Sequence, residues 1–153
     1  MKCLSVKQPW ASLIFHGKDI ENRTWHTKYR GEVLIHVSAK SAGIPSELLN
    51  EEQFDYFNIN PESGIWLQEL MAGKYITSAI IGKVDIVDCV TNHPSVWAEK
   101  GFAYASMDGT QYKEIYNWVL ANPVKFEKPI LNVKGKLSFW DYDVWADYLK
   151  LIK

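Results

Sequence analysis

The stretch from Leu4 to Lys40 decides the fold, and it reads LSVKQPWASLIFHGKDIENRTWHTKYRGEVLIHVSAK. The residues around its start, Cys3 to Val6, are apolar enough for a short strand. Pro9 suits the first turn of a helix, and apolar residues then recur at three- and four-residue spacing until Gly17. Gly31 begins a second strand, in which apolar residues occupy alternate positions. The sequence therefore predicts a strand, a short helix, an extended segment and another strand.

Short elements continue through the rest of the chain. Further strands are predicted over Tyr75–Val90, with a bulge or bend at Gly82, and over Ile115–Leu120, Ile130–Val133 and Leu137–Trp140. Helices are predicted from Ser46 to Gln53, with Ser46 as N-cap, from Ile65 to Met71, from His93 to Lys100 and over about 142–152, with a loop at 57–64. About six short strands broken by short helices favour a mainly β or α+β fold, a small mixed barrel with flanking helices.

The 153 residues are enough for one domain, so we expect a single domain over 1–153. Aromatic residues reach 14%, with seven Trp and eight Tyr, and some are expected to line a surface for flat ligands. The net charge of −1 gives no global attraction to nucleic acid. Residues 1–40 nevertheless carry seven cations against three acids, whereas 41–70 carry six acids and no Lys or Arg. This acidic insert can be a lid over a cleft, a plain extension of the domain, or a surface for a protein partner.

Several classes of protein are disfavoured by what the sequence does not contain. No run of about 18 apolar residues predicts a membrane-spanning helix, and the N-terminus does not resemble a secretory signal. Cys3 and Cys89 lack the spacing of a metal or redox motif, so a cytoplasmic location is expected. His16, His26 and His36 recur at ten-residue intervals that match no ligand geometry, so no metal and no cofactor is predicted.

The extended segment 18–25 carries the candidate binding residues. If the segment is a strand, Glu21, Arg23 and Trp25 project to one face. The carboxylate can accept a hydrogen bond from a base amine, the guanidinium can bind phosphate or a carbonyl, and the indole can stack on a base. Further positive charge around this face is expected from Lys7, Lys18, Arg30 and Lys40. Glu21 and Arg23 can instead be a plain ion pair, and Gln8 either hydrogen-bonds in the cleft or caps the helix.

The ordered segments QPWASLI (8–14), GKDIENR (17–23) and RG (30–31) resemble the activating-signal-cointegrator homology (ASCH) family of the PUA-like superfamily. The likeness extends more loosely to residues 81–89, 116–123 and 135–140, and it is weakest over 41–70. It implies a PUA-like β-barrel with a cleft between the barrel and the N-terminal helix. It also implies binding of RNA or a nucleoside, or of a modified nucleobase within RNA, by this cleft.

The same resemblance raises an enzymatic alternative. Some small family members hydrolyse N4-acetylcytidine with a Lys, a Thr three residues later and a Glu elsewhere, and ribonuclease activity has been ascribed to others. Lys18 matches the Lys, Glu21 stands in place of the Thr, and Glu99 is a weak match to the last member. A carboxylate at this position can act as general base for water rather than as the nucleophile. Binding of RNA is therefore the main expectation, with hydrolysis and protein interaction as alternatives.

Overall fold

A computed structural model describes residues 1–59, 72, 74–104 and 106–145. Its helices and strands are, in chain order, β1 (Lys2–Val6), α1 (Trp10–Ile14), β2 (Ile20–Arg23), β3 (Gly31–Val37), α2 (Pro45–Leu48), α3 (Glu51–Ile59), β4 (Ala79–Val90), β5 (Phe102–Tyr104), β6 (Tyr112–Glu114), β7 (Tyr116–Ile130) and β8 (Phe139–Asp141). No helix in this described part is long and apolar enough to cross a membrane.

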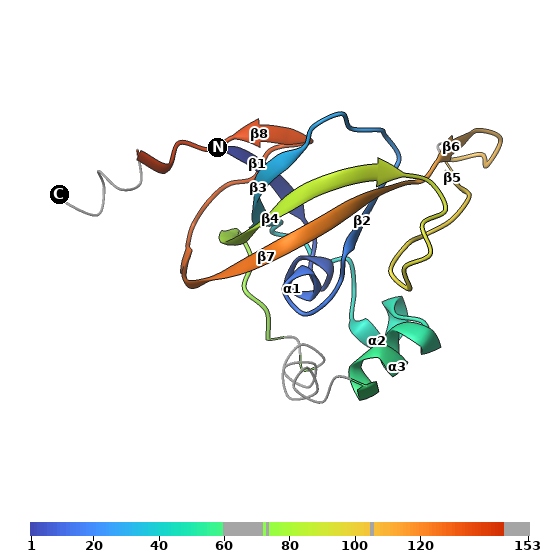
Figure 1. Ribbon diagram of the computed structural model, residues 1–153, viewed down its shortest axis with the longest axis horizontal. Coiled ribbons are helices and arrows are strands. Elements are labelled where there is room, and N and C mark those ends of the chain that lie inside the picture. Colours follow the sequence, from blue (N-terminus) through green and yellow to red (C-terminus); the bar gives the residue numbers. More distant parts are fainter. Residues whose placement is uncertain (60–71, 73, 105, 146–153) are drawn as a thin grey trace.

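Six of the strands form one curled sheet in the order β2-β7-β4-β3-β1-β8, which makes a half-barrel (Figure 1). Strands β1 and β3 run parallel, and the other neighbouring pairs are antiparallel. Strands β5 and β6 form a separate hairpin at one end. Helix α1 lies beside the sheet, with α2 and α3 next to it (Figure 1). This architecture confirms the predicted mainly β, mixed-barrel fold with short helices.

Strand β3 lies near the centre of the sheet and is covered on both faces. Val33, Ile35 and Val37 pack into the main core, which also contains residues of α1. Leu34, on the opposite face, packs in a second cluster with Trp140 and other residues of β1, β4 and the C-terminal region. Because both faces are buried, all of residues 33–37 are buried, rather than every second one.

The predicted bulge at Gly82 is confirmed. Strand β4 shifts register between Ile80 and Gly82 where it pairs with β7. A side chain at Gly82 would collide with the Val124 carbonyl of β7 and with the Phe15 ring just after α1. The glycine therefore lets β7 and the end of α1 approach β4 closely.

Several predicted boundaries are wrong. Strand β7 continues to Ile130 instead of ending at Leu120, and no separate strand covers 130–133. Residues 93–100 form turns rather than a helix, and the short strands β5 and β6 were not predicted.

The acidic segment also differs from its prediction. Its first helix begins at Pro45 with Ile44 as N-cap, because proline suits the first helical position, so Ser46 is not the cap. The backbone is extended at Leu49, and α3 then starts after Asn50. The loop predicted over 57–64 is wrong at its start, because residues 57–59 belong to α3. The rest of that loop, the predicted 65–71 helix and most of the 142–152 helix lie outside the described residues.

Candidate functional site

Lys18 follows the glycine turn that ends α1. The backbone of Gly17 has φ = +111°, a conformation that favours glycine, and the Tyr56 ring of α3 lies where a side chain at this position would stand. Lys18 is 4% exposed, and its ammonium donates to the Ile20 carbonyl. Burial lowers the pKa of Lys18 below its ordinary value, and the Glu21 carboxylate opposes that shift.

Glu21 and Arg23 lie on the same face of β2, as alternation predicts. Arg23 Nη2 is 3.9 Å from Glu21 Oε2, too far for a direct hydrogen bond, and it donates instead to the Ser5 carbonyl at 2.9 Å. The Arg23 guanidinium also lies 5.9 Å from the centroid of the Trp118 ring. Glu21 is 6% exposed, and its Oε2 has no hydrogen-bond partner among the described residues. The site therefore holds a buried carboxylate with a free acceptor position.

Lys18 and Glu21 line a pocket of about 220 Å³, which we call the central pocket. Its walls consist of Trp10, Lys18, Glu21, Asn22, Leu48, Asn50, Gln53, Trp97 and Glu99. The Lys18 ammonium is 5.7 Å from the centroid of the Trp10 ring. Part of the acidic segment thus forms one wall of the pocket. The pocket combines two carboxylates, one buried ammonium and two indole rings.

Asparagine side chains hold the wall formed by residues 97–99 in place. Asn22 donates to the Trp97 carbonyl at 2.9 Å and accepts from the Glu99 N–H at 3.0 Å. Asn117, fully buried in β7, donates to Asn22 Oδ1 and to the Glu99 carbonyl, both at 2.9 Å. It also accepts from the His93 N–H at 2.9 Å. These bonds explain why residues 93–100 are not helical, because their backbone groups bind to β2 and β7 instead.

Two further pockets adjoin the central pocket along β2. The basic pocket, of about 300 Å³, is lined by Ser5, Val6, Lys7, Trp10, Glu21, Asn22, Arg23, Lys136, Leu137 and Ser138. It shares Trp10, Glu21 and Asn22 with the central pocket. The third pocket, of about 280 Å³, is lined by Asn22, Arg23, Thr24, Trp25, Glu99, Ala103 and Ile115. The three pockets therefore meet at Asn22.

The structure brings some of the expected site residues together and separates others. Lys18, Glu21 and Glu99 share the central pocket, and Lys7 joins Arg23 in the basic pocket. Trp25 lies beyond β2, which ends at Arg23 before a bend at 24–25, and it lines neither the central nor the basic pocket.

Trp25 instead packs edge-on against Trp118, with ring centroids 4.5 Å apart, and it lines the third pocket. Gln8 is fully buried and accepts a hydrogen bond from the Ser12 N–H at 3.0 Å, so it satisfies a backbone donor in the first turn of α1, whose N-cap residue is Pro9. Arg30 is exposed and lies 3.6 Å from Asp88, and Lys40 is exposed as well. Neither Arg30 nor Lys40 lines any of these three pockets.

Sequence reasoning missed four contributors to the site. The helical spacing of Trp10 relative to Leu13 predicts a core residue, yet Trp10 lines both the central and the basic pocket. Asn22 has a detectable signal, since it is the polar residue between Glu21 and Arg23 on β2. Trp97 and Lys136 have no such signal, because their positions depend on contacts distant in sequence.

The chain resembles known proteins over most of its length. A model of the ASCH domain matches residues 4–130. Human activating signal cointegrator 1 is 31% identical over 154 aligned positions, which cover 92% of this chain and 22% of that protein. The mouse protein of the same name is 30% identical with the same coverage. The chain thus spans about a fifth of the length of the curated relatives it matches. By the extent of the domain match and by these relatives, the chain belongs to the ASCH domain family.

Proposed function

We propose that the chain binds RNA, or a modified nucleobase within it, in the central pocket. Membership in the ASCH family supports this proposal, because the family implies an RNA-binding type of module. The observation that carries the proposal is the Glu21 carboxylate, which is buried and has an unused acceptor oxygen among the described residues. An unsatisfied buried acceptor of this kind costs about 1–3 kcal/mol, and a ligand that donates a hydrogen bond offsets that cost.

The rest of the pocket favours a base as that ligand. The exocyclic amine of a nucleobase donates to a carboxylate, and the indole of Trp10 offers a surface on which a ring can stack. Drug-sized ligands occupy pockets of about 300–1,000 Å³. A volume of about 220 Å³ suits one base rather than a larger molecule. In this proposal Glu21 orients the base, Trp10 stacks on it, and Lys18 supplies a donor.

The proposal is tested with fluorescein-labelled single-stranded RNA and fluorescence anisotropy. The substitution Glu21→Gln removes the charge and keeps the shape, and it is expected to weaken binding at least tenfold, about 1.4 kcal/mol. Glu127→Gln is the matched control, because Glu127 is exposed on β7 and lines none of the three pockets. RNA binding that is absent from the parent protein, or unchanged in Glu21→Gln, would falsify the proposal.

A hydrolase is the second candidate, and one observation favours it: Lys18, Glu21 and Glu99 line the same pocket. The lining residues of this pocket include no Ser, Thr or Cys. Water is then the nucleophile, with a carboxylate as general base, and attack on N4-acetylcytidine releases acetate and cytidine. Incubation with N4-acetylcytidine tests this by chromatography of the products. Activity that Lys18→Met and Glu21→Gln both abolish supports the hydrolase, and no cytidine at high protein concentration rejects it.

A further inference from the structure

We infer that the RNA leaves the central pocket through the basic pocket, so that its sugar–phosphate backbone lies against Lys7, Arg23 and Lys136. In this arrangement one base occupies the central pocket and the neighbouring phosphate lies in the basic pocket. The inference rests on the proposed function and adds to it the path of the strand and a phosphate-binding subsite.

The central and basic pockets are adjacent. They share Trp10, Glu21 and Asn22, so a ligand that stacks on Trp10 lies at the boundary between them. The central pocket, at about 220 Å³, has room for one base, and the basic pocket adds about 300 Å³ next to it. A base bound in the central pocket therefore has room for its sugar and phosphate in the adjacent basic pocket.

The net charge of the lining side chains differs in sign between the two pockets. The basic pocket presents three cations, Lys7, Arg23 and Lys136, against the single carboxylate of Glu21. The central pocket presents two carboxylates, Glu21 and Glu99, against one ammonium. A phosphate group is attracted by the basic pocket and repelled by the central pocket. This difference favours the base in the central pocket and the phosphate in the basic pocket.

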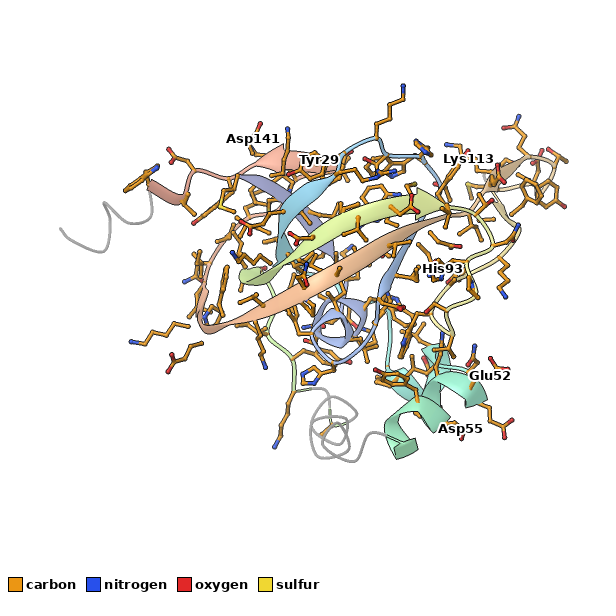
Figure 2. The ribbon with its side chains drawn as sticks, in the orientation of Figure 1. Tyr29, Glu52, Asp55, His93, Lys113 and Asp141 are labelled. Carbon is orange, nitrogen blue, oxygen red and sulfur yellow. The ribbon has the colours of Figure 1, made fainter. Side chains whose placement is uncertain are left out.

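Helix α3 strengthens this asymmetry on the side of the central pocket. Asn50 and Gln53 line that pocket, and the same segment carries exposed carboxylates at Glu51, Glu52 and Asp55. Glu52 and Asp55 lie at the outer edge of the molecule (Figure 2). Exposed charges act over a Debye length of about 8–10 Å at moderate salt. A strand that continued across α3 would therefore bring its phosphates close to like charge.

The lysines of the basic pocket are available for a ligand. Lys7 and Lys136 are exposed, and neither forms an ion pair within the described residues. Lys136 belongs to the segment that connects β7 to β8, and the next residue, Leu137, is 95% exposed. This leucine offers an apolar contact to a sugar or to the next base. Lys7 and Lys136 approach the pocket from segments far apart in the sequence, as expected for two sides of a groove.

The salt dependence of RNA binding tests the inference. Each phosphate contact with a single strand contributes a slope of about −0.7 to a plot of log affinity against log salt concentration. The probe is a fluorescein-labelled RNA of random sequence about ten nucleotides long, within the usual range of single-strand sites. The double variant Lys7→Ala/Lys136→Ala is expected to make the slope shallower by about 1.4. Lys128→Ala is the matched control, because Lys128 is exposed on β7 and lines none of the three pockets.

The outcomes separate this inference from the proposed function. If the parent protein binds the RNA and the double variant keeps the parent's slope, the strand path is wrong and the proposed function stands. If Lys128→Ala reduces the slope by as much as each lysine of the double variant does, RNA binding depends on surface charge in general, and the subsite is rejected. If the parent protein binds no RNA at low salt, the proposed function itself fails. Circular dichroism of each variant checks that a reduced salt dependence does not come from unfolding of the variant.

Discussion

The substitution Trp10→Ala tests whether this indole is the surface on which a base stacks. Stacking of a base on an aromatic side chain contributes about 1–3 kcal/mol, so its loss is expected to weaken RNA binding about 5- to 150-fold. Trp10 also packs partly against two apolar clusters. Truncation of a fully buried tryptophan costs about 3–5 kcal/mol. For this half-buried ring we expect a loss of about 2 kcal/mol in the free energy of unfolding.

Two measurements separate these effects. Urea denaturation gives the fraction of Trp10→Ala that is folded, and anisotropy titration with labelled RNA gives the affinity of that fraction. Trp10→Phe keeps an aromatic face and is expected to bind within about fivefold of the parent, since only part of the stacking energy is lost. If folded Trp10→Ala binds RNA within twofold of the parent, Trp10 does not stack on the ligand and the assignment of the central pocket is refuted.

Three further predictions concern stability. Burial lowers the pKa of His16 to about 4 and that of His36 below its ordinary value, so the unfolded chain takes up protons near pH 6.5 before the folded one does. The stabilisation that comes from the two neutral histidines should be fully present above pH 6.5, and the free energy of unfolding should decrease as the pH falls toward 4. Urea denaturation curves with the same midpoint across this range would contradict the prediction. Gly82→Ala should destabilise the fold by about 1–3 kcal/mol, because the added methyl group is too close to the backbone of β7. A melting temperature equal to the parent's would show that β7 shifts to make room without cost. Asn117→Ala should cost about 3 kcal/mol for its three hydrogen bonds and also weaken RNA binding, since Asn117 positions Glu99; unaltered binding by the folded variant would remove that positioning role.

The sequence predicted those parts of the fold that depend on local pattern. The strand at 2–6, the helix after Pro9 and the strand from Gly31 follow from periodicity and from glycine and proline positions. The full length of β7 could not be predicted, because Asn122 and Pro123 resemble a turn. Asn122 does have a positive φ of 54°, but its side chain donates to Asp85 of β4 at 3.0 Å, and the pairing of the two strands continues past it.

The candidate site was predicted in part for the same reason. Glu21 and Arg23 share a face because they are two residues apart on a strand, which is a local rule. The rule fails at Trp25, because it requires the strand to continue and the chain bends after Arg23. The role of Trp10 could not be inferred from its helical spacing, since the pocket beside it exists only after the segment around Asn50 packs against the body. Local rules therefore identified Lys18, Glu21 and Arg23, and tertiary packing added Trp10, Trp97 and Lys136.

The contact between Gly17 and Tyr56 links the shape of the central pocket to a residue outside it. Gly17 does not line that pocket, yet a single hydrogen atom there lets the tyrosine of α3 seat against the end of α1. Any larger residue must displace the ring of this tyrosine, which belongs to the same helix as Gln53 of the pocket wall. In the proposed function, a residue that does not line the central pocket would thus influence which ligands fit it, through the tyrosine that packs against position 17.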